Sequence, residues 1–247
     1  MSTSEKSTKI EPPFLVDPND LAIQSFPDVD GEDVAGWYIQ LQAHERGEDP
    51  RAALREAYMR RVFRIPAELR ARPQWVVSGA DKEPMRATGG HASVKDPSTW
   101  TSFETAASAA FERGTWPSFV LTAADEFACI DLDVKDATSH PDKPELWTTP
   151  EQRERFNAIV EAFGCYTERS RSGKGLHIWA RGNIGTGCRR DHVEVYSQGR
   201  HIVCTGDTFH ALPVADRLDL LLSMAARMSA LDATDETTLV ELPEREP

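Results

Sequence analysis

The chain has 247 residues, 40% of them hydrophobic, and a formal charge of −12 at pH 7. This length favours one substantial globular domain with additions, or two small domains. No apolar run reaches the roughly 18 residues of a membrane span, and the N-terminal stretch MSTSEKSTKIEPPF lacks the apolar core of a signal peptide. We therefore expect a cytoplasmic protein with no membrane partner.

Residues 1–30 are polar, contain proline and show no periodicity, so we expect this segment to be disordered or extended. A helical hairpin is predicted over 31–64. Apolar side chains recur at i, i+3, i+4 and i+7 from Val34, and Asp49-Pro50 provides an N-cap followed by proline at the first helical position. We expect the Trp and Tyr residues of this hairpin to be packing residues.

Between residues 65 and 230, predicted strands alternate with helices. Helices are expected after the capping boxes TSFE at 101–104 and TPEQ at 149–152, and a last helix over 214–229. The predicted strands are 74–78, 118–122, 127–133, 165–169, 176–181, 192–196 and 200–205. The short connections after 122 and 196 favour hairpins. This pattern describes an α+β domain with a mostly antiparallel sheet, followed by an acidic, disordered tail over 231–247.

The four cysteines are widely spaced without any C-x-x-C, and the seven histidines form no H-x-x-x-H pair. These patterns favour buried, reduced thiols and argue against a zinc site.

The basic residues are unevenly distributed. From Arg169 to Arg200 the chain has seven basic and two acidic side chains, a net charge of +5, so the rest of the chain carries −17. A basic segment in an acidic protein indicates either a confined site for a polyanion or a solvated face, and both interpretations stay open at this point.

The stretch ACIDLDV at 128–134 would be a fully buried strand but for Asp131 and Asp133. Alternation along a strand places both carboxylates on one face, with Cys129, and the apolar side chains on the other. Asp is depleted in strands, and two neighbouring carboxylates repel each other unless a cation or a cluster of donors lies between them. The alternatives are a solvated face and a metal site at a strand end.

Two later segments also place polar side chains on predicted strands. SRSGKGLHIWARG at 170–182 is a Ser/Gly turn that leads into the strand of His177, and its N–H groups could hold phosphate oxygens. It is not a Walker loop, because the glycine spacing is wrong and no helix follows. HVEVYSQGRHIVCTG at 192–206 places Glu194 between two valines and Arg200 at the start of the returning strand. A polar turn and a surface hairpin would equally explain these two segments.

The motifs IDLD, SGKGLH and VEVY, in this order, resemble those of the archaeo-eukaryotic primase superfamily, in particular the primase-polymerases of phages and plasmids. The similarity extends to IPAELRARPQWVV, DPSTWTSFETA and GRHIVCTG, and so covers about residues 65–210. The resemblance implies an RRM-like catalytic core preceded by the helical hairpin. It also implies a site with two Mg²⁺ or Mn²⁺ ions on Asp131, Asp133 and Glu194, and nucleotide contacts from His177, Ser172, Lys174, Arg200 and Lys82.

The activity implied by the resemblance is that of a DNA primase and polymerase. It would join dNTPs or NTPs on a single-stranded DNA template and release pyrophosphate. One alternative is a metal-dependent nuclease, because carboxylates serve phosphodiester hydrolysis equally well. The other is a non-catalytic nucleic-acid-binding replication domain. Glu194 stands where some relatives have aspartate, and neither a zinc-binding stem nor a helicase segment is visible. A separate replicative helicase is therefore an expected partner.

Overall fold

The computed structural model of the chain describes residues 26–27, 33–34 and 36–232. The two segments predicted to be disordered lie outside the described residues, except for a short strand at 26–27 and the end of the last helix at Asp232. No helix in the described part of the chain is both long enough and apolar enough to cross a membrane.

The N-terminal unit, 1–54, is the smaller of two compact units into which the chain divides. Its strands β1 (Phe26–Pro27) and β2 (Asp33–Val34) pair antiparallel. Helix α1 spans Gly36–Glu45, and α2 spans Pro50–Val62 and so continues into the second unit. The two predicted consecutive helices are therefore present.

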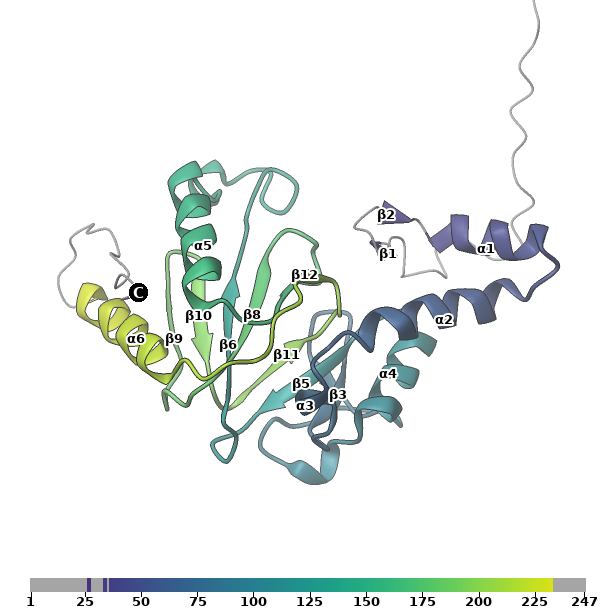
Figure 1. The fold of residues 1–247 in the computed structure, drawn as a ribbon, viewed down its shortest axis with the longest axis horizontal. Coiled ribbons are helices and arrows are strands. Elements are labelled where there is room, and N and C mark those ends of the chain that lie inside the picture. The colour runs from purple at the N-terminus through teal and green to yellow at the C-terminus, as the bar shows by residue number, and fades with distance from the viewer. Residues whose placement is uncertain (1–25, 28–32, 35, 233–247) are drawn as a thin grey trace, which may run out of the picture. The chain divides into compact units, whose positions relative to one another are not determined.

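The larger unit, 55–247, contains two antiparallel sheets (Figure 1). The six-stranded sheet has the order β12 (Thr208–His210), β7 (Thr167–Arg169), β8 (Leu176–Arg181), β6 (Phe127–Leu132), β10 (Val193–Tyr196), β9 (Cys188–Arg190). The four-stranded sheet has the order β11 (Arg200–Val203), β5 (Pro117–Leu121), β3 (Trp75–Ser78), β4 (Pro84–Met85). All pairings between these strands are antiparallel, so the predicted α+β class is confirmed.

The two predicted hairpins are wrong, because the chain changes sheets at both connections. β5 pairs with β3 and β11, whereas the next strand, β6, pairs with β8 and β10. β10 and β11 are separated in the same way. At the first crossing, the Asp125 carboxylate accepts hydrogen bonds from the Thr122 N–H at 2.8 Å and from the Gln74 amide at 2.7 Å. These bonds hold the turn without pairing the strands on either side of it.

Helices cover one face of the six-stranded sheet. In Figure 1, α5 (Pro150–Phe163) and α6 (Leu218–Asp232) both lie against it, while α4 (Phe103–Glu112) lies against the four-stranded sheet. α3 is a single turn at Ala67–Arg70, and 3₁₀ turns occur at Pro97–Thr99 and Pro144–Leu146. The helical spacing of apolar residues places them toward the sheet. This core contains Phe156, Ile159, Val160, Phe163, Leu221, Met224 and Met228, packed on Ile130, Ile178 and Val195.

Aromatic rings join the two sheets on the other face. The ring of Phe119 in β5 lies edge-on to Trp179 of β8, with centroids 5.7 Å apart, and to Phe127 of β6, at 6.0 Å. Trp75 of β3 contacts the same ring at 5.2 Å. Edge-to-face contacts between buried rings add stability beyond the area that they bury. This face therefore has an apolar core, and its polar side chains lie toward the C-terminal end of β6.

Helix caps were predicted at two places with different outcomes. The capping box expected at 101–104, with Thr101 as the N-cap, is wrong. The N-cap of α4 is the next residue, Ser102, whose hydroxyl accepts from the Thr105 N–H at 3.3 Å. The box at Thr149 is confirmed. Its hydroxyl accepts from the Gln152 N–H at 3.2 Å, and the Gln152 side chain accepts from the Thr149 N–H at 2.8 Å.

Replacing Thr149 with Ala is expected to lower the free energy of unfolding by about 1 kcal/mol, because it leaves an N–H group of the first helical turn without its acceptor. Urea unfolding followed by circular dichroism measures this change. Thr138→Ala is a matched control, since Thr138 is an exposed threonine of the preceding loop and no side-chain bond is described for it. Equal losses in the two variants would contradict a capping role.

Candidate active site

Four ionisable side chains form one row across the six-stranded sheet. Asp131, in the central strand β6, lies directly opposite Glu194 of β10 and His177 of β8. His177 in turn lies opposite Glu168 of β7. Residues directly opposite each other in neighbouring strands point to the same face, so these side chains share the face that is turned away from α5 and α6.

The row changes from buried to partly exposed along its length. Glu168 is fully buried and the His177 side chain is 7% exposed, whereas Asp131 and Glu194 are 30% and 28% exposed. His177 lies between two carboxylates: its Nε2 is 3.6 Å from Asp131 Oδ1, and its Nδ1 is 3.9 Å from Glu168 Oε1. The imidazole is thus held in a narrow slot with negative groups on both sides.

The pKa values of the two central groups reflect this arrangement. Burial raises the pKa of Asp131, the His177 ring opposes that shift, and the carboxylates of Asp133 and Glu194 add to it. For His177, burial lowers the pKa, but the carboxylates of Asp131 and Glu168 outweigh burial and the net shift is upward. Both pKa values are therefore shifted upward, that of Asp131 mainly by burial and that of His177 by its two neighbouring carboxylates.

The carboxylates of Glu194 and Asp133, the other two predicted metal ligands, already contact polar side chains. The Tyr196 hydroxyl donates to Glu194 Oε2 at 2.6 Å, and Arg200 Nη2 lies 3.8 Å from the same oxygen. Arg200 also donates to the Tyr196 hydroxyl at 2.8 Å and stacks over its ring at 4.5 Å. Asp133 Oδ2 lies 3.7 Å from the Lys135 ammonium.

The predicted metal ligands are close in the fold but do not converge on one point. Within the described residues, no three Asp, Glu, His or Cys side chains are arranged so that they could share a metal ion. The donor set nevertheless suits Mg²⁺ or Mn²⁺, which prefer carboxylate oxygens. Like charges directly opposite each other on neighbouring strands are destabilising. A divalent cation would relieve that repulsion between Asp131 and Glu194.

The Ser/Gly turn at 170–175, which was predicted to bind phosphate and is called the phosphate loop below, lies against the end of β6. A Cβ atom added at Gly175 would come 2.6 Å from the Leu132 carbonyl oxygen, so only glycine allows this close approach. Ser172 Oγ lies 3.1 Å from Ser170 Oγ, within the loop. The Lys174 ammonium, however, donates to both oxygens of Asp136, at 2.9 and 2.7 Å, and these bonds lower the pKa of that carboxyl to about 2.

Lys82 comes from the other sheet, in the loop between β3 and β4. Its backbone is left-handed, with φ of 64°, and its carbonyl oxygen lies 2.7 Å from His201 Nε2. The positive charge of Lys82 is close enough to oppose, in part, the upward pKa shifts of both Asp131 and His177. Of the predicted nucleotide contacts, Lys82, His177 and Arg200 therefore lie near the row, whereas Lys174 faces Asp136.

Sequence analysis missed Glu168 and considered Arg171 only as a basic residue beside the phosphate-binding turn. Glu168 completes the row, and its Oε2 accepts from the Tyr166 hydroxyl at 3.1 Å and from the Gly206 N–H at 2.8 Å. Arg171 donates to the Gly79 carbonyl at 3.0 Å and so ties the phosphate loop to the loop of Lys82. A charged residue within a predicted strand was the available signal for Glu168, but its partner strand could not be read from the sequence.

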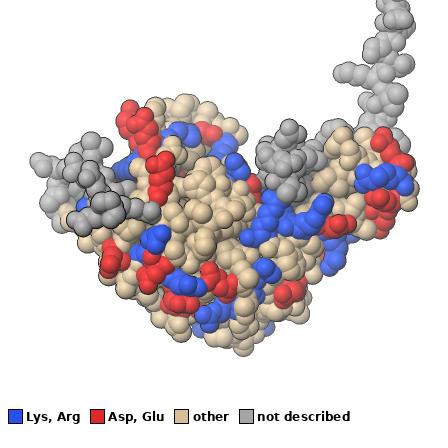
Figure 2. Space-filling view, viewed as in Figure 1, with Lys and Arg blue, Asp and Glu red and all other residues tan. Residues whose placement is uncertain are grey.

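The basic segment predicted from the sequence is dispersed in the fold. Several of its side chains face acidic groups from other parts of the chain, as in Arg169 with Asp207 at 3.1 Å and Lys174 with Asp136 at 2.7 Å. In the space-filling view, basic and acidic side chains of the larger unit are interspersed over the described surface (Figure 2). The local charge of +5 therefore does not form one continuous patch on this face.

Comparison with known proteins finds similarity to a phage protein. No protein-family model matches the chain. The chain is 29% identical over 174 residues to a DNA primase-polymerase of Nitratiruptor phage NrS-1. The match covers 64% of this chain but only 23% of that protein, so it spans about a quarter of the relative's length. The similarity to phage primase-polymerases that the motifs predicted is confirmed.

Proposed function

We propose that this chain, which is similar to a phage DNA primase-polymerase, joins nucleotides on a single-stranded DNA template and releases pyrophosphate. The observation that carries the proposal is the row of Glu194, Asp131 and His177 on three adjacent strands, in register. Nucleotidyl transfer needs oxygen ligands for divalent metal ions next to cationic groups for the triphosphate, and this row supplies both.

Asp131, Asp133 and Glu194 are the proposed ligands of two Mg²⁺ or Mn²⁺ ions. When bound, such ions stabilise negative charge on both the attacking and the leaving oxygen. Asp131 has the most to gain from a cation, because burial and two neighbouring carboxylates oppose its ionisation. In this proposal Glu194 gives up the Tyr196 hydroxyl, and Asp133 gives up the Lys135 ammonium.

The phosphates of the incoming dNTP or NTP are proposed to lie beside His177. Glu168, which is fully buried, orients the imidazole from the side opposite Asp131. In this proposal Lys82, in the loop between β3 and β4, and Arg200, at the start of β11, add positive charge beside the phosphates. Ser172 and Lys174 join them in the proposal, provided that the Lys174 ammonium exchanges Asp136 for a phosphate.

Primer extension tests this function directly. The full chain is mixed with a labelled primer annealed to a template, with Mn²⁺ or Mg²⁺ and all four dNTPs or NTPs. We expect products that lengthen to the template end, and that stop before the template base whose complementary nucleotide is withheld. Shortening of the labelled strand without added nucleotides would favour the nuclease alternative. Products that ignore the withheld nucleotide would contradict template-directed synthesis.

A further inference from the structure

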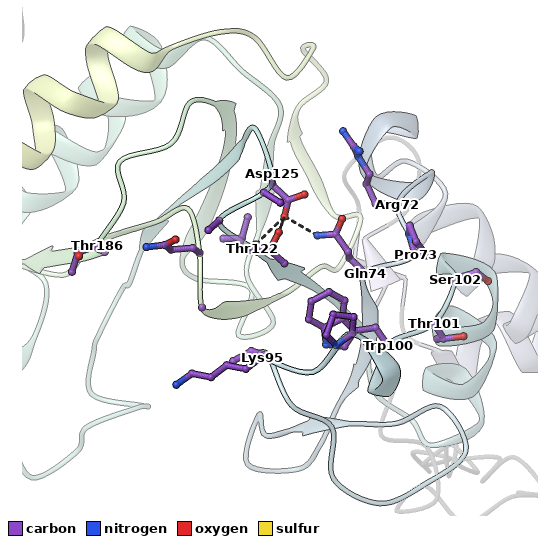
Figure 3. A pocket seen from close by; sticks show the side chains of 18 residues that line it. Arg72, Pro73, Gln74, Lys95, Trp100, Thr101, Ser102, Thr122, Asp125 and Thr186 are labelled. Atoms are coloured by element: carbon purple, nitrogen blue, oxygen red, sulfur yellow. Dashed lines mark hydrogen bonds between the residues drawn. The ribbon is translucent and has the colours of Figure 1, made fainter.

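A cavity of about 1070 Å³ lies in the larger unit, at the end of the sheets where the chain crosses from one to the other (Figure 3). It is bounded by Gln74 before β3, the 94–102 segment before α4, and the two crossings at 121–125 and 198–199. None of the predicted site residues lines it. The cavity is at the upper end of the size range of ligand sites, so it can take groups of nucleotide size.

The cavity adjoins the candidate active site across Tyr196 and Arg200. Gly187 lines the cavity, and a Cβ atom added there would come 2.5 Å from the Tyr196 ring. Gly199 also lines the cavity and directly precedes Arg200, which stacks on the same ring. The Tyr196 hydroxyl in turn donates to Glu194. Tyr196 and Arg200 therefore connect residues of the cavity with Glu194 of the row.

The side chains of the cavity suit a single strand of nucleic acid. Trp100 lines it and is partly buried. Its ring is held in place because the side chain packs on an apolar cluster around Val76 and its Nε1 donates to the Ser93 carbonyl at 2.7 Å. Lys95 also lines the cavity, is exposed, and has no described ion pair within the residues that the structure covers (Figure 3). An aromatic platform next to a lysine is the combination with which proteins bind a base and its phosphate.

The acidic group of the cavity does not oppose such a ligand. The Asp125 carboxylate is the acceptor of three hydrogen bonds, from the Gln74 amide at 2.7 Å and from the N–H and hydroxyl of Thr122 at 2.8 and 2.9 Å. Figure 3 shows this group of three bonded together on one wall, with Lys95 and Trp100 on another. The charge left free to meet a ligand is therefore positive.

We infer that this cavity binds single-stranded DNA, with a base on the ring of Trp100 and a phosphate beside Lys95. The inference rests on the proposed function, because the bound strand is taken to be the template on its way to the row at Asp131. A strand is favoured over a free triphosphate, because the cavity offers a ring and only two cations, Lys95 and Arg72, and Arg72 already lies 3.7 Å from the Glu126 carboxylate. Three phosphates need a denser cluster of cations.

The test is fluorescence anisotropy with labelled oligo(dT) and with an abasic strand of the same length, without metal or nucleotides. Trp100→Ala is expected to bind oligo(dT) about 10-fold more weakly and the abasic strand as the wild type does, because stacking needs a base. Trp100→Phe keeps a ring and should keep most of the affinity. Lys95→Ala should weaken both strands and reduce the slope of log K against log salt by about 0.7, the value for one lost phosphate contact.

Arg153→Ala is the matched control, because it also removes one positive charge, from an exposed site on α5, the helix that covers the opposite face of the sheet. It should leave both affinities unchanged. Lys95 is exposed, so its variant is informative even if Trp100→Ala fails to fold. If Lys95→Ala binds both strands with wild-type affinity and salt slope, the inference is overturned whether or not Trp100→Ala folds. A folded Trp100→Ala that binds oligo(dT) as the wild type does would overturn it as well.

This outcome is separable from failure of the proposed function. A wild-type protein that extends primers while the cavity variants bind DNA normally would retain the function and lose the inference. A wild-type protein that extends no primer, while Trp100→Ala and Lys95→Ala show the expected losses, would keep the cavity as a DNA site and lose the function.

Discussion

Replacing Asp131 with Asn is expected to reduce primer extension by about 100-fold or more, because the central carboxylate of the proposed metal site is lost while its shape is kept. The initial rate of extension at saturating template and nucleotide measures this effect. Asp142→Asn is the matched control, since Asp142 is an exposed aspartate in the loop after β6. A rate within a few-fold of wild type in Asp131→Asn would remove Asp131 from the site, whatever the activity of the protein.

The same variant is expected to be more stable than wild type at pH 7 in EDTA. The folded-state pKa of Asp131 is raised, above all by burial, so ionisation of this group opposes folding. Protonated Asp131 contributes to the stability of the folded state. This contribution is fully present below the pKa of an unfolded aspartate, and it is lost as the pH rises through the folded-state pKa. Asn does not ionise, and its advantage should therefore shrink as the pH falls toward the ordinary range of aspartate.

Melting temperatures at neutral and acidic pH measure that difference. Mg²⁺ or Mn²⁺ should raise the melting temperature of wild type more than that of Asp131→Asn, because a ligand stabilises only the state that binds it. Loss of activity together with loss of stability at pH 7 would mean that the variant is misfolded, and would contradict the proposed cost of ionising Asp131.

Replacing Asp207 with Ala is expected to lower the free energy of unfolding by about 3–5 kcal/mol, because it removes a buried carboxylate that contacts two guanidinium groups, one of them buried. Arg61 Nη2 lies 3.2 Å from Asp207 Oδ2, and the two side chains are only 8% and 7% exposed. Arg169 Nη1 contacts the other carboxylate oxygen at 3.1 Å. Urea unfolding with linear extrapolation measures the loss.

Glu126→Ala is the control for this variant. Glu126 lies 3.7 Å from Arg72 and 3.6 Å from Arg181, but it is 55% exposed, so its removal should cost less than about 1 kcal/mol. Similar losses in both variants would show that burial does not govern the strength of these pairs. A double variant, Arg61→Met with Asp207→Leu, should recover part of the loss, because it removes both charges.

The sequence predicted those parts of the fold that depend on local patterns. The helical spacing in 150–163, the cap at Thr149 and the alternation in 127–133 all act within a few residues of the chain. Alternation also placed Asp131 on the polar face of its strand. Each of these features is set by the backbone period and by nearby side chains, so a single sequence suffices to find it.

The sequence could not predict which strands pair. β5 and β6 are neighbours in the chain and were expected to form a hairpin, yet they lie in different sheets. Glu168 and His177 share a row because β7 and β8 pair in a particular register, which depends on long-range packing. For the same reason the contact of Lys174 with Asp136, a residue distant in the chain, was not expected.

The gradient of burial along the row makes the site one-sided. Its β7 end is closed, because Glu168 is fully buried and Gly206, with φ of 66°, packs so tightly that an added Cβ atom would meet the Arg61 carbonyl oxygen. The other side of the row meets solvent, since Asp131 of β6 and Glu194 of β10 are both partly exposed and Arg200 beside them is half-exposed. In the proposed function a phosphate group reaches the row from this open side, past Arg200, so one arginine would contact ligands of both the row and the neighbouring cavity.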